Sequence, residues 1–270
     1  MSDNEVRVAL GFYSVCHTVK KPEDYIDAYK KIRAMGYKYI EISPKLPFPA
    51  DEYNKITGDL GLSVCGMHAD IDMMRNEFDK TVKIANSVNC KYITIPHPLK
   101  MPGLIQPKSV AEWKKIAKDA NELGKKYFEN GITLQYHNHY YEFIEFDGKI
   151  GMDIIYGETD PKYLKAQIDT HWVLRGGANP SEWILKMKGR TEQIHLKDAG
   201  VNSEGKLLYM AVGEGNLDWE SILKACRECG IKDYIVEIDP NDYTPDPYLS
   251  VETAIKNIVK MGLISKEDLI

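Results

Sequence analysis

Long apolar runs, a signal peptide and an excess of positive charge are all missing from this sequence of 270 residues. No stretch reaches the roughly 18 consecutive apolar residues of a membrane-spanning helix, so we expect no membrane partner. The N-terminus, Met-Ser-Asp-Asn-Glu, is polar and acidic, which makes the cytoplasm the expected compartment. The formal net charge of -5 disfavours a nucleic-acid partner, because such a partner requires a basic surface.

Cysteine and glycine patterns exclude two further classes. The 5 cysteines are odd in number and scattered, which disfavours a disulfide framework. Cys226 and Cys229 form a CxxC pair, but it lies in an amphipathic run and no second pair completes a zinc site. The run Leu10-Gly11-Phe12-Tyr13, after the first apolar segment, does not supply a glycine-rich dinucleotide fingerprint. The sequence therefore favours neither a disulfide-stapled domain nor a dinucleotide-binding fold.

What the sequence does contain is one repeating rhythm, in which a short β-branched or aromatic segment precedes a longer helical pattern. The predicted strands are Val6–Tyr13, Tyr37–Ser43, Ser63–His68, Tyr92–Pro96, Ile132–Asn138, Leu164–Asp169, Gln193–Lys197 and Tyr234–Asp239. The predicted helices are Pro22–Met35, Ala50–Leu60, Arg75–Val88, Val110–Asn130, Ile150–Glu158, Pro180–Lys188, Trp219–Cys229 and Tyr248–Met261. Alternation at this spacing predicts a parallel sheet with crossover helices. Eight such units fit a single α/β domain over residues 1–270, a closed (β/α)8 TIM barrel.

Polar side chains stand near the carboxyl end of most predicted strands. They are Glu41, His68, His97, Gln135, His137, Asp169, His195 and Glu237. Buried polar groups must be paired, ligated or functional, and barrel active sites are assembled at that end from several strands. Residues 198–218, the longest irregular stretch, follow a strand and should lie on the same face. The pattern favours a polar, metal-binding pocket over separately satisfied core residues.

The best candidate ligands are three carboxylates and one imidazole. They are Glu142, Asp169, His195 and Glu237. This set suits one divalent ion with open positions for substrate oxygens, Mn²⁺ first, with Mg²⁺, Co²⁺ or Zn²⁺ as alternatives. Because it contains no thiolate, a closed structural zinc site is not expected.

Several segments of the second half resemble one known family in order and spacing. They are Gly131 to Phe143 (GITLQYHNHYYEF), Asp169 to Trp172 (DTHW), Gly176 to Pro180 (GGANP), His195 to Asp198 (HLKD), Gly213 to Trp219 (GEGNLDW) and Val236 to Asp239 (VEID). The chain resembles the sugar phosphate isomerase/epimerase family of the xylose isomerase-like TIM barrel superfamily. The resemblance implies a metal held by a Glu, an Asp, a His and a second Glu, the last three being Asp169, His195 and Glu237. For the first it implies Glu142, with Gln135 or a histidine as the fallback.

Two departures from the family pattern bear on the reaction. Epimerases often carry a histidine where this chain has Trp172, and their substrate-binding arginine has no counterpart in residues 198–212. Both weaken an assignment as a ketose 3-epimerase.

Contacts to a sugar-like small molecule are expected from further residues at this face. They are His68, His97, Gln135, His139, Trp172 and Lys197. For His68 and His97, simple packing is the alternative. Lys197 shares a strand face with His195, so it points to the same side of the barrel wall.

The ligand set predicts proton abstraction next to a carbonyl, because a bound cation acidifies the neighbouring C–H. The candidate bases are Glu237, His137 and Glu142. We expect a sugar or keto-sugar isomerase or epimerase. The alternative is a lyase, either an inosose-type dehydratase or an enzyme that eliminates the aglycone from a 3-keto-glycoside. A non-catalytic sugar-binding protein stays open, and relatives that are dimers or tetramers suggest a homo-oligomer by analogy alone.

Overall fold

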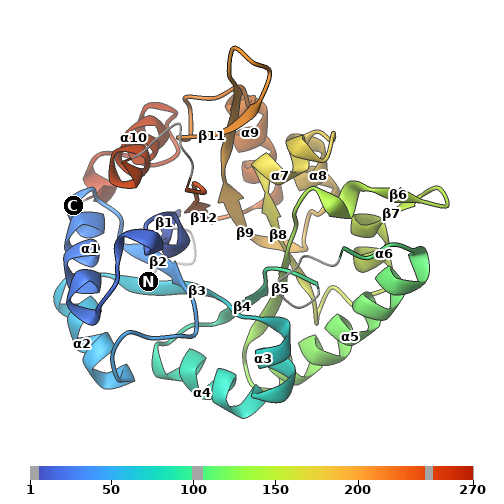
Figure 1. Ribbon diagram of the computed structural model, residues 1–270, viewed down its shortest axis with the longest axis horizontal. Coiled ribbons are helices and arrows are strands. Elements are labelled where there is room, and N and C mark those ends of the chain that lie inside the picture. Colours follow the sequence, from blue (N-terminus) through green and yellow to red (C-terminus); the bar gives the residue numbers. More distant parts are fainter. Residues whose placement is uncertain (1–5, 99–105, 241–245, 270) are drawn as a thin grey trace.

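The computed structural model describes residues 6–98, 106–240 and 246–269. Eight parallel strands close into a barrel in the order β1-β12-β9-β8-β5-β4-β3-β2 (Figure 1). Their bounds are β1 (Arg7–Gly11), β2 (Tyr39–Ile42), β3 (Ser63–His68), β4 (Tyr92–Ile95), β5 (Thr133–His137), β8 (Lys165–Asp169), β9 (Thr191–Leu196) and β12 (Asp233–Val236). This arrangement confirms the predicted TIM barrel.

Helices surround the barrel and cover the outer faces of the strands (Figure 1). They are α1 (Pro22–Ala34), α2 (Ala50–Asp59), α3 (Ile71–Asn76), α4 (Phe78–Ser87), α5 (Val110–Glu129), α6 (Gly151–Gly157), α7 (Thr170–Arg175), α8 (Pro180–Lys186), α9 (Trp219–Cys229) and α10 (Pro247–Lys260). The single helix predicted over residues 75–88 is two helices that meet at Glu77, and α7 was not predicted. None of the helices in the described ranges combines the length and apolar composition needed to cross a bilayer.

Successive side chains along each barrel strand point alternately outward, beneath the helices, and inward, into the barrel. Outward residues such as Leu10, Ile40 and Tyr136 belong to the main apolar core beneath the helices. Among the described residues, a small apolar cluster with Ala9 and Ile235 lies apart from that core. Many of the remaining buried strand residues are polar. A barrel interior of this kind is stable only when its polar groups are paired or bind a ligand.

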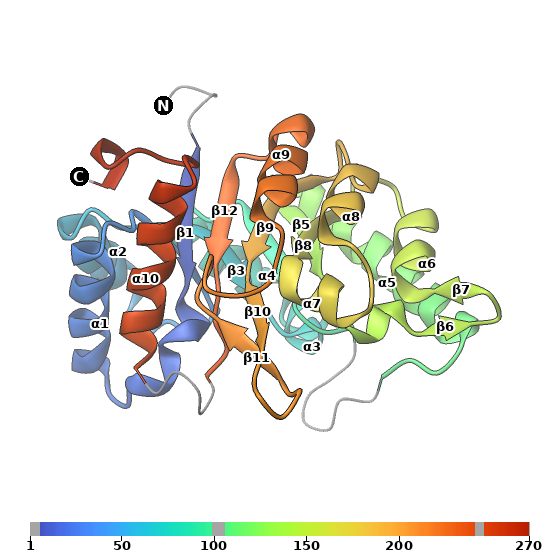
Figure 2. The same cartoon turned by 90° about the horizontal axis from the view of Figure 1, so that it is seen from above.

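The stretch 198–218 is not wholly irregular, as the sequence had suggested. It contains an antiparallel hairpin, β10 (Asp198–Val201) and β11 (Leu207–Met210), at the carboxyl end of the barrel strands (Figure 2). Asp198 organises the segment by accepting hydrogen bonds from Gly213 N (2.8 Å), Gly215 N (3.1 Å) and Trp219 Nε1 (2.7 Å). A shorter hairpin pairs β6 (Glu145–Phe146) with β7 (Lys149–Ile150).

Candidate metal centre and active site

Four buried side chains converge at the carboxyl end of the barrel. They are His137 from β5, Asp169 from β8, His195 from β9 and Glu237, directly after β12, and one ligand atom of each lies within 4.8 Å of the others. The four strands are consecutive neighbours in the closed sheet. The group therefore occupies one continuous half of the barrel rim.

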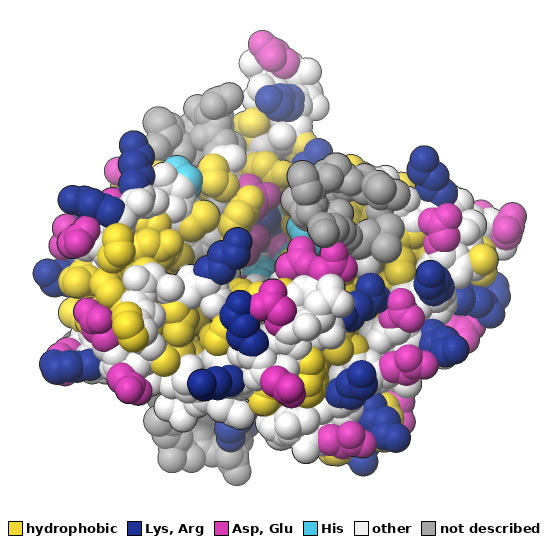
Figure 3. Space-filling model, turned by 60° about the horizontal axis from the view of Figure 1, so that its bottom comes forward, with side chains coloured by type: hydrophobic (Ala, Val, Ile, Leu, Met, Phe, Trp, Pro, Cys, Tyr) yellow, Lys and Arg dark blue, Asp and Glu magenta, His cyan; other side chains and the backbone are white. Residues whose placement is uncertain are grey.

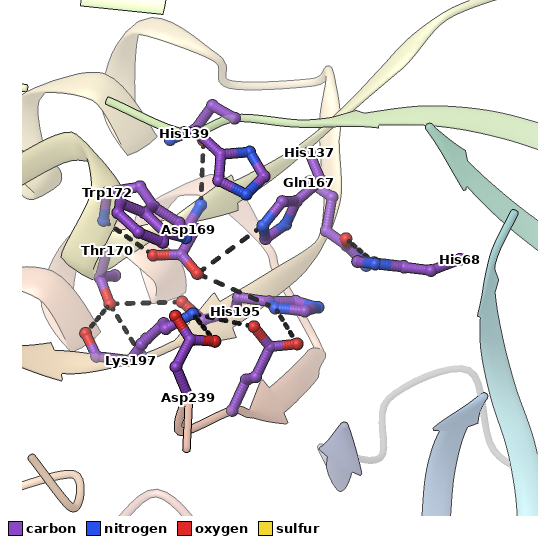
Figure 4. Close-up of polar contacts among 12 residues, drawn as sticks. His68, His137, His139, Gln167, Asp169, Thr170, Trp172, His195, Lys197 and Asp239 are labelled. Carbon is purple, nitrogen blue, oxygen red and sulfur yellow. Dashed lines mark hydrogen bonds and ion pairs between the residues drawn. The ribbon is translucent and has the colours of Figure 1, made fainter. Parts of the chain in front are cut away.

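Asp169 is oriented by the start of the helix that follows it. It is the N-cap of α7, and its Oδ1 accepts a hydrogen bond from Trp172 N at 2.9 Å. Its Oδ2 is buried without a hydrogen-bond partner among the described residues and faces His137 Nε2 and His195 Nδ1, each at 3.9 Å (Figure 4). Burial raises the pKa of Asp169 to about 7. A cation beside Oδ2 would offset that burial cost.

His195 is oriented by a carboxylate from across the barrel. Its Nε2 donates to Glu41 Oε2 at 2.9 Å, so Nδ1 points at Glu237 Oε2, 3.6 Å away. Burial opposes a charge on His195, but Glu41 and Glu237 outweigh it and raise the His195 pKa to about 9. The carboxylates thus favour a cation at this point, either a proton or a metal ion. A carboxylate behind a ligating histidine is a common way to fix the ring of a metal ligand.

The residues present fit a divalent ion. Separations of 3.6 and 3.9 Å between facing atoms are too long for hydrogen bonds. They are close to the roughly 3–3.5 Å that separates two ligands bound to one ion at about 2.1 Å. His195 Nδ1, like Asp169 Oδ2, is buried without a partner among the described residues. Two imidazoles and two carboxylates are a donor set for a first-row divalent metal.

The structure does not bring Glu142 into this group. Glu142 is fully buried, and its two carboxylate oxygens accept from Tyr136 Oη at 2.6 Å and His139 N at 2.9 Å. Burial raises the pKa of Glu142 to about 8. The expectation that Glu142 binds the metal or moves a proton does not fit this position. His137, which the sequence offered as a candidate base, stands with the other candidate ligands instead.

Gln135 is also displaced from its expected role. It points into the barrel one pleat below His137, and its Nε2 donates to Gln193 Oε1 at 2.8 Å. Gln135 is not among the residues that line the cavity. Its contacts are therefore to the barrel interior rather than to a substrate.

Lys197 joins two carboxylates at the edge of the cluster. Its Nζ lies 2.9 Å from Glu237 Oε1 and 2.8 Å from Asp239 Oδ1, and its side chain is 1% exposed (Figure 4). Burial would raise the pKa of Glu237, but the ammonium of Lys197 and the imidazole of His195 hold it below its usual value. Burial raises the pKa of Asp239 in spite of the same ammonium. The pKa values of the two carboxylates that share this ammonium are thus shifted in opposite directions.

The sequence did not predict the contacts made by Glu41, Gln167 and Asp239. Gln167 Nε2 donates to Glu41 Oε1 at 2.7 Å, and Gln167 Oε1 accepts from His68 Nε2 at 2.7 Å. Strand alternation was the available signal, because Gln167 and Asp239 each stand two residues from a candidate ligand.

A cavity of about 520 Å³ opens above the cluster. It is lined by the expected residues His68, His97, His137, His139, Trp172, Lys197 and Glu237. Figure 3 shows the hollow, with histidine and acidic side chains inside it and apolar side chains beside it. His97 Nδ1 lies 3.0 Å from Tyr141 Oη, and burial lowers the pKa of His97 to about 4. The polar floor and the size of the cavity suit a sugar-sized molecule.

Comparison with known proteins gives a family and a fold. A family profile described as xylose isomerase-like TIM barrel matches residues 29–258. Curated relatives include inosose dehydratases from Clostridium beijerinckii, 28% identical over 154 residues, and Geobacillus thermodenitrificans, 24% identical over 152 residues. The chain spans about half the length of each of these relatives (51% and 50%), and each match covers 51% of this chain.

Solved structures agree along nearly the whole chain. A sugar phosphate isomerase/epimerase from Parabacteroides distasonis superimposes with a TM-score of 0.79 at 22% identity, covering 94% of this chain and 98% of that one. A D-psicose 3-epimerase from Clostridium cellulolyticum, solved with D-tagatose, gives 0.71 at 14% identity, covering 93% and 97%. At these identities the likeness shows the barrel fold.

Proposed function

The chain belongs to the xylose isomerase-like TIM barrel family, and we propose that it is a divalent-metal-dependent isomerase or epimerase of a sugar or keto-sugar. The reaction begins by removing a proton from the carbon next to a carbonyl. The observation that carries the proposal is the buried cluster of His137, Asp169, His195 and Glu237, of which His137 and Glu237 line the cavity.

The same four residues would hold the metal. A bound divalent ion polarises a carbonyl and stabilises the negative charge that develops beside it. Because His137 completes the group in place of the expected third carboxylate, the site carries one negative charge fewer than the ligand set expected from the sequence. Two imidazoles favour Mn²⁺, Co²⁺ or Zn²⁺ over Mg²⁺, which prefers all-oxygen sites.

Glu237 is the proposed base. Its lowered pKa keeps it ionised near neutral pH, and Lys197 fixes one of its oxygens. Asp239, on the same ammonium, also lines the cavity, and it is the second carboxylate within reach of a substrate proton. Two carboxylates with separated proton affinities are a common arrangement for acid–base pairs. His137, the other candidate base, is better used as a ligand, since its neutral ring faces Asp169.

A lyase is the second candidate, and the named relatives favour it. The curated matches are inosose dehydratases, although they cover only 51% of this chain. Elimination starts with the same proton abstraction and differs only in what leaves the neighbouring carbon. Trp172, in the place where epimerases often carry a histidine, is compatible with this alternative.

Deuterium exchange tests both candidates. The metal-loaded protein is incubated in D₂O with a panel of ketoses, inososes and 3-keto-glycosides, and the carbon next to the carbonyl is followed by NMR. Exchange with a retained carbon skeleton and all oxygens supports an isomerase or epimerase, and loss of water or of an aglycone supports a lyase. Sugar binding without exchange would contradict the enzymatic proposal.

Two variants separate the base from the ligands. Glu237→Gln should abolish exchange, and its metal content must be measured because Glu237 is also a candidate ligand. His137→Asn should lower metal content and lose exchange with it. Full metal occupancy with undiminished exchange in His137→Asn would remove His137 from the centre.

A further inference from the structure

One side of the cavity is built mainly of aromatic and aliphatic side chains. This aromatic wall consists of Phe12, Tyr13, Tyr25, Tyr29, Ile42, Leu46, Pro47 and Tyr53. Its residues lie in β2, α1, α2 and the segments that follow β1 and β2. In the strand order, β1 and β2 lie across the barrel from β5 and β8, which carry His137 and Asp169. The wall therefore faces two members of the ion cluster across the cavity.

The rings of the wall pack against one another, and the wall adjoins the reacting end of the cavity. Phe12 and Tyr25 stack with ring centroids 5.4 Å apart at 15°, and Tyr29 meets Tyr53 edge-on at 6.0 Å. At Gly11, immediately before the wall, an added Cβ would lie 3.3 Å from Glu237 Oε2. The backbone that leads into the wall thus runs directly past the proposed base.

Tyr13 is the one member of the wall that is largely open to solvent. Its side chain is 56% exposed although it lines the cavity. A large exposed aromatic residue beside a pocket commonly marks a surface that a ligand covers. A single sugar seated on the ion cluster would leave this apolar surface in contact with water.

We propose that the substrate carries an aryl group joined to the sugar, and that this group lies against the aromatic wall while the sugar occupies the ion cluster. The inference rests on the proposed function, because it takes the sugar site from it. A second sugar fits the wall less well, since its hydroxyls would be desolvated against Phe12, Leu46 and Pro47. A flat aromatic group lying against the accessible rings of Tyr13 and Tyr25 buries apolar area at low entropic cost.

Calorimetry with the Mn²⁺-loaded chain tests the inference without requiring turnover. The probes are matched pairs of 4-nitrophenyl and methyl glycosides of glucose, galactose and xylose, with cellobiose as the two-sugar probe. We expect the aryl member of at least one pair to bind at least tenfold more tightly than its methyl partner and than cellobiose. Tyr13→Ser should reduce that advantage at least threefold. Phe128→Ser, which changes a 44% exposed aromatic residue outside the cavity, should preserve it.

Each other outcome overturns the aryl assignment. Equal affinity within every pair, including the absence of binding by both members, refutes it. Tighter binding of cellobiose than of the aryl glycosides would mean that the wall binds a second sugar. An aryl-over-methyl affinity ratio that is unchanged in Tyr13→Ser would mean that the aryl group binds away from the wall. Deuterium exchange is scored separately. Exchange without an aryl preference refutes the aryl group but leaves the proposed function standing. An aryl preference without exchange supports the aryl group but refutes the proposed function.

Discussion

Replacing Lys197 by methionine should strongly destabilise the metal-free protein. Lys197 is 1% exposed, and its ammonium is the cation placed within 2.9 Å of both Glu237 and Asp239. Methionine preserves most of the volume of the side chain but leaves two neighbouring carboxylates without that charge. Removing one partner of a buried ion pair typically costs about 3–5 kcal/mol. For a domain of this size that corresponds to a fall in Tm of roughly 5–9 °C.

Urea unfolding at pH 7.5 in the presence of a chelator measures this loss directly. Lys186→Met is the matched control, because Lys186 pairs with Asp153 at the surface and both side chains are about half exposed. Exposed pairs contribute about 0–1 kcal/mol, so the control should unfold almost as the wild type does.

Two changes of conditions should restore part of the stability that Lys197→Met loses, because each compensates for the missing positive charge. Lowering the pH should narrow the gap between Lys197→Met and the wild type, because protonation neutralises carboxylates that have lost their cation. Adding Mn²⁺ should also narrow it, since a cation beside Glu237 replaces part of the missing charge. A metal-free Lys197→Met protein within about 1 kcal/mol of the wild type at pH 7.5 would refute the reasoning.

Three other predictions come from separate parts of the barrel. Glu41→Gln should weaken Mn²⁺ affinity about 10–100-fold, measured by calorimetry, because His195 loses the carboxylate that fixes its ring; unchanged affinity would exclude that role. Burial lowers the pKa of His97 to about 4, so between about pH 6.5 and 4 this histidine binds a proton in the unfolded chain but not in the folded chain. The free energy of unfolding therefore falls as the pH is lowered from 6.5 towards 4. In metal-free His97→Asn, the loss of stability between pH 6.5 and 4 should be smaller than in the wild type by up to about 2 kcal/mol. An equal loss in the two proteins would contradict a neutral, buried His97. Gly124→Ala in α5 should lower the free energy of unfolding in urea by at least about 2 kcal/mol, because its Cβ would lie 2.1 Å from Tyr163 O. Gly58→Ala in α2 should stabilise by about 0.5–1 kcal/mol, because its Cβ would have no neighbour within 4 Å. Equal effects of the two substitutions would contradict the steric argument.

The barrel was predictable because each strand carries its own local signal. The predicted segment Ser63–His68 is β3 itself, and the other strands differ from their predicted bounds by a few residues at most. Elements that depend on contacts made after folding were missed. Helix α7 has only 6 residues, Thr170–Arg175, which is too short to show a helical period in the sequence. The β10–β11 segment is held by hydrogen bonds that converge on Asp198 from residues far along the chain. Such long-range partners leave no periodic pattern in the sequence.

The candidate site was predictable only where strand ends determine position. Asp169, His195 and Glu237 stand together because their strands are neighbours in the closed sheet. Glu142 lies beyond the end of β5 in a short 3-10 helix, Tyr141–Phe143, where chain direction no longer follows the pleat. Its carboxylate turns to Tyr136 instead of the cavity. The assignment of the ligands themselves remains a proposal that metal binding must test.

The ion cluster and the aromatic wall stand on different strands of the barrel, so evolution can change ion binding and substrate preference independently. The ion cluster draws on β5, β8, β9 and β12, whereas the aromatic wall is attached to β1 and β2. A chimaera that keeps everything from β5 onward and takes its first four β/α units from another such barrel would inherit its ion cluster from one parent and its substrate preference from the other. Two contacts limit the exchange. The incoming half must supply a carboxylate where Glu41 meets His195 and a residue without a side chain where Gly11 passes Glu237.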